Sequence, residues 1–348
     1  MDLTARYTTR TLPAGAGLDD LVARLRGEVI RPGDPTYNDA RAVWNAAIDR
    51  RPAGIVRAAG AADVRTALAF AHTRGLPLAV RGGGHHVAGL GTVDGGLVLD
   101  LGGMRAISVD RVARTAWVGA GTRLRDLDRA TQVFGLAVPA GQISDTGVAG
   151  LTLGGGTGWL MRRHGLTIDN LLAVELVTAD GRVLRASEDD HADLFWGVRG
   201  GGGNFGVVTA FQYRLHPVGP IVLGGPILHT LDRAGAALRA YRDFMAGAPD
   251  ELTAFAVFTT VPAGPPFPRT CTAGGSWRST SATPGRSKRA SGSSPRCAST
   301  ARPRSTSSAR SPTSCARTCS TAPHRAACTT TTRAATCGRW PTRRSTRW

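Results

Sequence analysis

The sequence feature that most restricts the fold is an abrupt change of composition after Pro268. Residues 269–348 contain no Leu, Ile, Val, Met, Phe or Tyr, and 31 of them are Ser or Thr. Such a segment cannot bury enough apolar surface to offset the entropy lost when its chain is ordered. We therefore expect a folded body that ends near Pro268, followed by a disordered, non-globular basic tail over 269–348.

The charge of the chain is divided at the same place. The formal net charge is +18, and residues 269–348 contain 15 Arg, one Lys and neither Asp nor Glu. The body over 1–268 is therefore nearly neutral, which does not suit a nucleic-acid-binding domain. The tail itself offers only three Trp for base stacking. Nucleic-acid binding through the basic tail is kept as an alternative, but nucleic acid is not the expected partner.

Three interpretations of the tail compete: a nucleic-acid-binding arm, a Cys-rich metal or disulfide module, and the product of a shifted reading frame. All six Cys lie in the tail, yet Cys315 and Cys319 are the closest pair, and no second pair or His-x3-5-His pattern follows. No metal site is therefore predicted. The body contains no Lys and is rich in Ala, Gly and Arg, as in a GC-rich gene. We favour the shifted frame, so 269–348 is not expected to be native.

The body has the pattern of an α+β protein with mixed sheets. Two apolar runs, Gly54–Ala58 and Leu76–Val80, flank the amphipathic segment Ala61–Thr73, which predicts a strand–helix–strand unit with parallel strands. Asp180-Gly181 between two strand-like runs predicts a hairpin. A new series begins after Pro217 and offers three elements before Pro268, too few to close a core. The predicted domains are 1–218, an incomplete domain over 219–268, and the tail over 269–348.

The chain shows no sign of membrane insertion or export. It has no run of about 18 apolar residues, so no membrane span is expected. Residues 1–10 contain neither an apolar core nor a twin Arg, so no secretory signal is predicted. We therefore expect a cytoplasmic protein.

Three glycine clusters predict a site for an anion. They are Gly82–Gly84, directly after a predicted strand, Gly154–Gly158, and Gly200–Gly206. Consecutive glycines let backbone N–H groups converge on a phosphate because no side chain blocks its approach. Three flexible loops are the alternative, but three clusters together favour a large phosphate-bearing cofactor. The third cluster satisfies G-x-G-x-x-G, yet a predicted helix precedes it and a strand follows it, so we reject a Rossmann site there.

Two adjacent histidines, His85 and His86, follow the first glycine cluster. Neighbouring residues in an extended segment point to opposite sides, so the pair is not expected to hold one metal ion. An imidazole beside a cofactor is also a competent nucleophile toward an activated flavin methyl group. An ordinary loop histidine remains the alternative at this point.

Four segments of the body, within 34–217, resemble one known family. They are Val80–Gly89, Val118–Thr122, Gly147–Gly156, and Asp193–Trp196 leading into Gly202–Gly206. In this order they resemble the FAD-linked oxidases of the berberine-bridge-enzyme-like and 6-hydroxy-D-nicotine oxidase group. That group has the vanillyl-alcohol-oxidase fold with a two-subdomain, PCMH-type FAD-binding domain. Four motifs in order are far more specific than any single glycine run.

The resemblance implies that FAD binds in an extended form between two subdomains. His85 takes the place of the histidine that the family joins covalently to the 8α-methyl group of the flavin. Many members add a second bond through a Cys, but Ile143 stands in that place and the body has no Cys. A single histidyl link through His85 is therefore predicted. The implied cofactor-binding residues are Arg81, Gly82, Gly83, Gly84, His85, His86, Gly147, Gly150, Thr152, Gly154, Gly155, Thr157, Val177, Gly206 and Val207.

The resemblance also implies an activity: oxidation of a small-molecule alcohol, sugar or amine by hydride transfer to flavin N5, with reoxidation by O2. Thr146 falls at the family's presumed O2-gating position, where Val or Leu is usual, so oxidase and dehydrogenase both stay open. In the family the chain returns to the FAD domain at its C-terminus, and no such segment is recognisable here. No catalytic residue is therefore assigned, the oligomeric state is not predicted, and a truncated flavin-binding remnant without turnover is the alternative.

Overall fold

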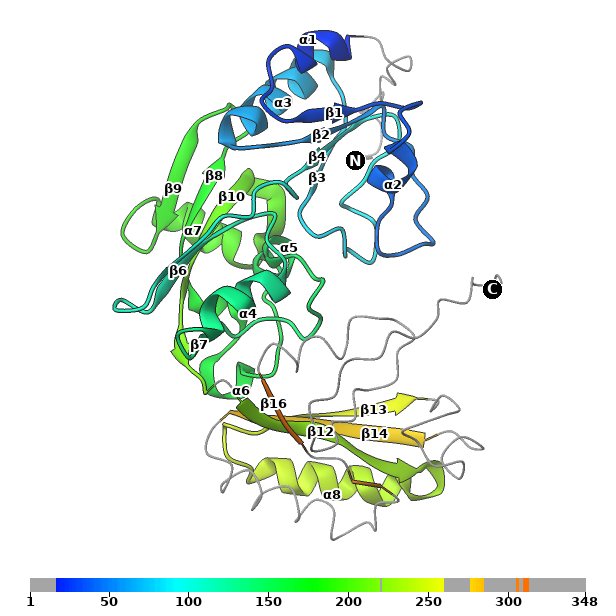
Figure 1. Cartoon of the computed structure of the whole chain (residues 1–348), viewed down its shortest axis with the longest axis vertical. Helices are drawn as coiled ribbons and strands as arrows, with labels where there is room; N and C mark the ends of the chain where they lie inside the picture. The colour runs from blue at the N-terminus through cyan, green and yellow to red at the C-terminus, as the bar shows by residue number, and fades with distance from the viewer. Residues whose placement is uncertain (1–16, 220, 260–275, 285–304, 307–308, 313–348) are drawn as a thin grey trace, which may run out of the picture. The chain divides into compact units, whose positions relative to one another are not determined.

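The computed structural model describes residues 17–219, 221–259, 276–284, 305–306 and 309–312. The chain forms two compact units, Met1–Val218 and Gly219–Trp348, which we call the first and second units (Figure 1). The α+β class with mixed sheets, predicted from the sequence, is confirmed. Among the described residues, no helix combines the length and the apolar character that a membrane span needs.

The first sheet of the first unit has the order β1-β2-β4-β3. Its strands are β1 (Glu28–Ile30), β2 (Gly54–Arg57), β4 (Leu97–Asp100) and β3 (Leu78–Arg81). The prediction that β2 and β3 run parallel is right in direction, but they are not neighbours, since β4 lies between them and pairs with both. The reason is burial: Leu97, Val98 and Leu99 of β4 are at most 1% exposed, and only a central strand is covered on both faces.

Helices cover both faces of this sheet. Helix α3 (Ala61–Arg74) packs Val64 with Val56 and Leu99 on one face. The opposite face packs Ile55 and Val98 against Tyr37 of α2 (Tyr37–Arg41). Because consecutive strand residues point to opposite faces, the continuous apolar run of β2 serves both cores. Helix α1 (Leu18–Val22) precedes the first strand and buries Leu18 and Leu21.

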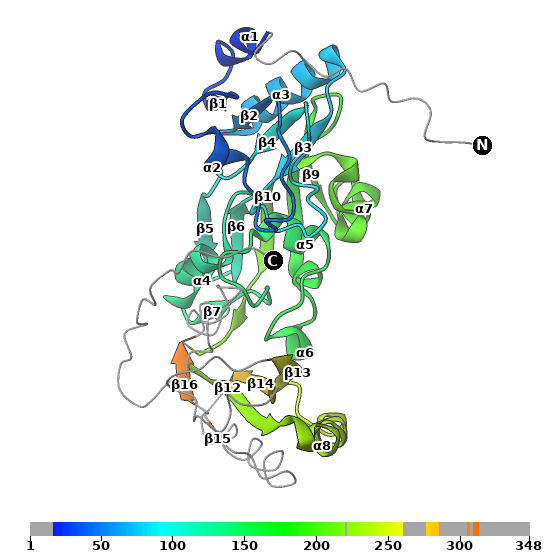
Figure 2. The same ribbon diagram turned by 90° about the vertical axis from the view of Figure 1, so that its right-hand side faces the viewer.

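The second sheet of the first unit is antiparallel throughout, with the order β5-β6-β10-β8-β9. Strand β10 (Val207–Arg214) lies at its centre, and β8 and β9 form the hairpin predicted at Asp180-Gly181, with Gly181 at φ 81° (Figure 2). The other strands and the elements around them are β5 (Ile107–Asp110), β6 (Thr115–Gly119), β8 (Leu171–Val177), β9 (Val183–Ser187), β7 (Leu136–Ala137), β11 (His216–Pro217), α4 (Leu124–Gln132), α5 (Val148–Leu153), α6 (Met161–His164), η1 (Thr167–Asn170), α7 (Ala192–Gly201) and η2 (Gly202–Phe205).

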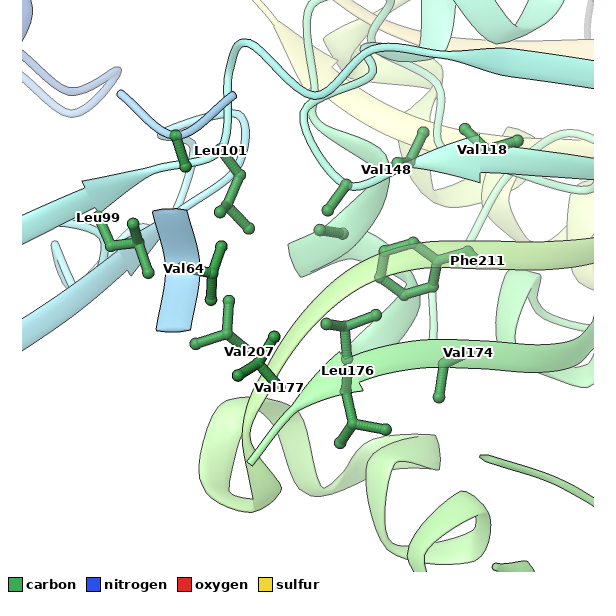
Figure 3. Packing of buried hydrophobic residues seen from close by; sticks show 14 of the residues in the cluster. Val64, Leu99, Leu101, Val118, Val148, Val174, Leu176, Val177, Val207 and Phe211 are labelled. Carbon is green, nitrogen blue, oxygen red and sulfur yellow. The ribbon is translucent and has the colours of Figure 1, made fainter. Parts of the chain in front are cut away.

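One hydrophobic core joins the two sheets of the first unit. Figure 3 shows Val64 of α3 and Leu99 of β4 on one side, and Phe211 of β10 on the other. Val177 and Val207, at the ends of β8 and β10, lie where the two parts of this core meet. The two sheets and the loops between them are therefore one packed body, and the loops that carry the glycine motifs are anchored on it.

The second unit contains a sheet with one helix on it. Strand β12 (Ile221–Thr230) pairs with β14 (Ser276–Pro284), β15 (Ser305–Thr306) and β16 (Ala309–Pro312), and β13 (Thr253–Thr259) pairs with β14. After η3 (Leu231–Arg233), helix α8 (Ala234–Ala246) lies along one face of this sheet (Figure 1). Ala234, Ala237 and Leu238 of α8 pack with Ala256 of β13.

The tail differs from its prediction at three short segments. We expected no regular structure after residue 268, yet β14, β15 and β16 pair with β12. Backbone ladders need only N–H and C=O groups, and Thr fits a pleated strand well, so a segment without Leu, Ile, Val, Met, Phe or Tyr can still add strands to an existing edge. The remainder of the tail, including all six Cys, lies outside the described residues. The shifted reading frame therefore stays a prediction.

Candidate cofactor-binding site

The first and third motif segments touch each other through backbone atoms. A Cβ added to Gly83 would overlap the backbone of Gly147, and one added to Gly147 would overlap the backbone of Gly83. A Cβ on Gly82 would lie 3.3 Å from both the Ala120 oxygen and the Ala149 Cβ. Only residues without a side chain allow this approach. The predicted glycine loops at 82–84 and 147 are thus brought together at the start of α5.

The second motif segment is tied to the same place. The Thr122 oxygen accepts a hydrogen bond from the Val148 N–H at 3.0 Å, and the Thr146 oxygen accepts one from the Leu124 N–H at 3.0 Å. The first turns of α4 and α5 are thereby held side by side. Helices α7 and η2, which contain the fourth motif, also contact α5. The four segments that lie far apart in the sequence therefore converge on one short helix.

Arg81 places a buried positive charge beside the point where the motif segments meet. Its Nη2 donates to Asp100 Oδ2 at 2.8 Å, and the two side chains are only 7% and 13% exposed. The Nη1 atom of Arg81 is buried and has no hydrogen-bond partner among the described residues. A buried guanidinium donor without a partner is costly unless an anion completes it. This orphaned donor, beside a loop that excludes side chains, fits the pyrophosphate of FAD.

His85 and His86 have different surroundings. His85 is partly buried, and its Nδ1 lies 2.9 Å from the Gly83 oxygen, so Nδ1 carries the proton and Nε2 keeps its lone pair. Its ring stacks on Trp44, with centroids 5.8 Å apart and planes inclined by 20°. His86 is exposed, and its Nδ1 accepts the Ala88 N–H at 3.2 Å. Of the two, His85 therefore has the ordered ring and the open nucleophilic nitrogen.

The predicted binding residues of α5 and of the loop after it are divided between core and surface. The Thr152 hydroxyl is buried and hydrogen-bonds the Tyr213 hydroxyl at 2.7 Å, so it serves the core. Burial raises the pKa of Tyr213 far above its ordinary value, and the Thr152 bond offsets this only in part. Gly150, Gly154 and Thr157 are exposed, and Gly155 is partly buried at φ 108°. Only this second group is placed to meet a ligand from solvent.

Val177, Gly206 and Val207 form one backbone cluster. Val177 and Val207 are cross-strand partners in the β8–β10 ladder, and both side chains are buried in the core. A Cβ on Gly206 would lie 2.5 Å from the Val177 oxygen, and Gly206 has φ 145°. The structure brings these three predicted residues together, with only their backbone available to a ligand.

The third glycine cluster has a structural explanation that the sequence did not suggest. A Cβ on Gly197 or Gly201 would lie 2.9 Å or 2.5 Å from the ring of Phe205, so these glycines admit that ring. Asn204 Nδ2 donates to the Gly201 oxygen at 2.7 Å, closing a turn. The cluster reverses the chain between α7 and β10, an order that confirms the rejection of a Rossmann site. Packing on Phe205 gives Gly201 a structural role, and a phosphate contact of this cluster stays a prediction.

The sequence analysis missed one segment of the site. Residues 44–50 approach the loop that carries His85 through Trp44, Asn45 and Arg50. Trp44 itself is the one local sequence signal that marks this segment. Its partners are some 40 residues away in the sequence, so no local pattern gives the contact.

Comparison with known proteins agrees with this geometry. Residues 52–187 match the FAD binding domain family. The matched segment lies within the first unit. The curated relatives and solved structures that the chain resembles include FAD-linked oxidoreductases and oxidases.

Individual relatives match larger shares of the chain. The (R)-6-hydroxynicotine oxidase of Paenarthrobacter nicotinovorans is 40% identical over 201 residues, which are 58% of this chain and 44% of that protein. The crystal structure of 6-hydroxy-D-nicotine oxidase from Arthrobacter nicotinovorans is 32% identical, with a TM-score of 0.77, over 84% of this chain and 63% of that one. The BBE-like 1 protein of Physcomitrella patens is 29% identical, with a TM-score of 0.74, over 84% of this chain and 62% of that one. The chain thus spans less than half the length of the curated relatives it matches.

Proposed function

We propose that this protein binds FAD covalently through His85 and oxidises a small-molecule alcohol, sugar or amine. One observation carries the proposal. The four family motifs converge on α5, and the imidazole of His85 stands at this convergence with Nδ1 bonded to Gly83 and Nε2 open. When bound, FAD supplies a two-electron acceptor that takes a hydride from the substrate.

The residues of this chain have separate tasks in the proposal. The backbone N–H groups of Gly82–Gly84 and Gly147 approach the pyrophosphate where no side chain intervenes. The orphaned Nη1 of Arg81 adds a charged donor to the same anion. Asp100 holds the guanidinium in place from its other edge. His85 tethers the cofactor, and a tether prevents loss of the flavin between turnovers.

The electron acceptor of the proposed reaction is O2, with Thr146 as the residue that decides its access. The Thr146 carbonyl carbon would lie 3.4 Å from a Cβ on Gly83, which places this residue against the glycine loop. Among the solved relatives, wild-type Phl p 4.0202 is a glucose dehydrogenase, and an isoleucine-to-valine variant of Phl p 4 is a glucose oxidase. A change of one apolar side chain therefore accompanies the difference between these two activities. Stopped-flow reoxidation of the photoreduced protein by O2, compared with Thr146→Val, tests this assignment: equal rates contradict it.

A flavin-binding remnant without turnover is the second candidate. It is favoured by the extent of the match, which covers 44% of the first curated relative. The two candidates share the flavin and differ in catalysis. Reduction of the bound flavin by an alcohol, sugar or amine under anaerobic conditions supports the oxidoreductase. A yellow protein that no member of a panel of such substrates bleaches supports the remnant.

The proposal as a whole is tested by acid precipitation of the purified protein. Yellow colour that stays with the washed pellet indicates a covalent flavin. The His85→Ala variant should release its flavin into the supernatant, whereas the neighbouring variant His86→Ala should keep it in the pellet. A colourless pellet from the wild-type protein, or an unchanged one from His85→Ala, contradicts the link.

A further inference from the structure

Trp44 lies against the imidazole of His85 without being part of the core. The two rings are stacked with their centroids 5.8 Å apart, and the backbone N–H of Trp44 donates to the Gly84 oxygen at 3.0 Å. The Trp44 side chain nevertheless stays 51% exposed. Burial therefore explains little of its placement. What the placement provides is a flat surface that limits rotation of the neighbouring ring.

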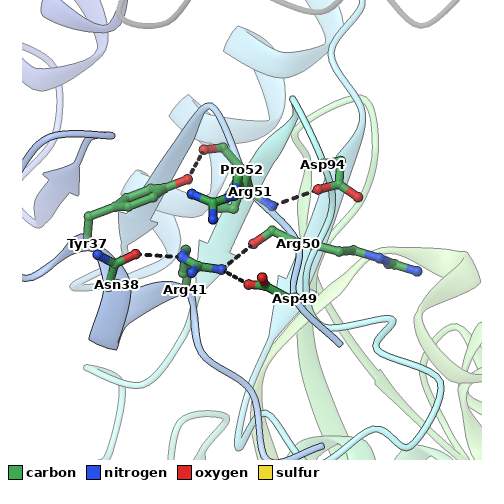
Figure 4. Close-up of polar contacts among 8 residues, drawn as sticks. All are labelled: Tyr37, Asn38, Arg41, Asp49, Arg50, Arg51, Pro52 and Asp94. Carbon is green, nitrogen blue, oxygen red and sulfur yellow. Dashed lines mark hydrogen bonds and ion pairs between the residues drawn. The ribbon is translucent and has the colours of Figure 1, made fainter. Parts of the chain in front are cut away.

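The segment that carries Trp44 is fixed at both ends by a polar network. Arg41 bonds Asn38 Oδ1 at 2.9 Å, the Arg50 oxygen at 3.2 Å, and the carboxylate of Asp49 (Figure 4). The hydrogen bond from Arg41 holds the pKa of the Asp49 carboxyl below its ordinary value, so the pair is ionised at neutral pH. The Tyr37 hydroxyl donates to the Pro52 oxygen at 2.7 Å. We call residues 41–52 the clamp.

The clamp in turn holds the loop that carries His85. Asn45 Nδ2 donates to the Val87 oxygen at 2.7 Å. Arg50 Nη1 donates to the oxygens of Gly89 and Thr92 at 3.1 Å and 2.7 Å, and the Arg51 N–H donates to Asp94 Oδ1 at 2.7 Å. Three of these bonds go to backbone oxygens of the loop after His85, and the fourth goes to the carboxylate of Asp94. The clamp therefore fixes the path of residues 84–94 as well as the ring of His85.

We propose that Trp44 is a positioning residue for the covalent attachment of FAD to His85, an inference that rests on the proposed function above. The Gly83 oxygen holds the Nδ1–H edge of the imidazole, and Trp44 holds its face. Together these two contacts fix the direction in which Nε2 points. In the attachment, the N–C bond forms while one C–H bond of the 8α-methyl group and one imidazole N–H are lost. The two electrons and two protons released pass to O2, which becomes H2O2.

Trp44→Ala removes the stacking surface but leaves every hydrogen bond of the clamp in place. Stacked aromatic rings contribute modest energies, yet small displacements of a reacting group have large effects on rate. We expect attachment of FAD to slow roughly tenfold in Trp44→Ala, and Trp44→Phe to restore most of the rate. Phe134, which follows α4 and lies outside the four motif segments, is a 46% exposed aromatic residue, so Phe134→Ala is the matched control.

The full chain, prepared as apoprotein from flavin-limited cells, is incubated with FAD in air. Samples are precipitated with acid at intervals, and the flavin absorbance of the pellets gives the rate of attachment. Non-covalent affinity for FAD is measured in the His85→Ala background, with and without Trp44→Ala. The expected result is slow attachment in Trp44→Ala, rescue by Trp44→Phe, a normal rate in Phe134→Ala, and similar affinities in the two His85→Ala proteins.

Two results overturn the inference. Attachment by Trp44→Ala at the wild-type rate shows that stacking is dispensable. A loss of non-covalent affinity that matches the loss of rate shows that Trp44 binds FAD in general and does not position His85. Failure of the proposed function looks different, because the wild-type protein itself then yields a colourless pellet.

Discussion

Arg81 and Asp100 form an ion pair at the C-terminal ends of two neighbouring parallel strands, with Nη2 and Oδ2 2.8 Å apart. The two residues are also cross-strand partners in the β3–β4 register, so the ladder itself sets their separation. Asp100 Oδ1 is used a second time, by the Gly102 N–H at 2.9 Å. The pair thus connects the start of the glycine loop with the turn after β4.

Breaking this pair should destabilise the first unit. Asp100→Asn leaves the Arg81 charge buried without a counterion, and removal of one partner of a buried pair typically costs about 3–5 kcal/mol. Urea unfolding followed by circular dichroism measures the loss. The exposed pair Arg57–Glu28 is the control, since Glu28→Gln should change stability by less than about 1 kcal/mol. Equal effects of the two substitutions would refute the structural role assigned to the buried pair.

Gly83 should tolerate no side chain. In Gly83→Ala the new Cβ overlaps the Gly147 backbone, so the first and third motif segments must separate. We expect a loss of about 1–3 kcal/mol in stability and a clear loss of FAD affinity, measured by urea unfolding and by flavin fluorescence titration. Gly203→Ala is the matched control, because its Cβ would meet nothing within 4 Å. Normal FAD affinity in Gly83→Ala would show that the close contact is unnecessary.

The hydroxyls of Thr152 and Tyr213 should be energetically coupled. Tyr213 is fully buried, and its hydroxyl lies 2.7 Å from that of Thr152. Either Thr152→Val or Tyr213→Phe leaves the other hydroxyl buried without its partner, which should cost about 1–3 kcal/mol. The double variant should be more stable than the sum of the two losses predicts, because no unpaired hydroxyl remains. Strict additivity in the double-mutant cycle would contradict the hydrogen bond.

His216 should make the protein less stable in weak acid. Its Nε2 donates to Asn170 Oδ1 at 2.5 Å, and its ring stacks on His164. Burial, together with the nearby positive charges of His164, Arg214 and Arg163, lowers the pKa of His216 to about 4. Since the unfolded chain takes up this proton near pH 6.5 and the folded protein only near pH 4, stability should fall as pH falls through that range.

The measurement for His216 is the urea midpoint at several pH values from 7 to 4. In His216→Gln the midpoint should depend less steeply on pH than in the wild-type protein, because one linked proton is removed. His72→Gln provides a comparison, since it changes a surface histidine of α3. The same steepness in His216→Gln and in the wild-type protein would refute the assignment.

The sequence predicts well those structural features that depend on residues close together in the chain. The hairpin at Asp180-Gly181 and the helix ending at Gly75 follow from turn chemistry, and both are present. The insertion of β4 between β2 and β3 depends on long-range pairing, which local periodicity does not contain. Within the site, the glycine loop at 82–84 was predicted from its residues alone.

Other features of the site depend on contacts that only the fold creates. The buried hydrogen bond between the Thr152 and Tyr213 hydroxyls joins residues 61 positions apart. The stacking of Trp44 on His85 joins two loops with no shared motif. Gly197 and Gly201 are required by the ring of Phe205, so a glycine-rich string alone does not distinguish a phosphate loop from a packing requirement.

Peptide mapping of the purified flavoprotein tests the central claim most directly. Trypsin cleaves after Arg81 and Arg105, so one peptide, Gly82–Arg105, contains both His85 and His86. The account predicts that this peptide carries the mass of FAD and that fragmentation places it on His85. Flavin on His86, flavin on another peptide, or an unmodified Gly82–Arg105 from a protein saturated with FAD would contradict it.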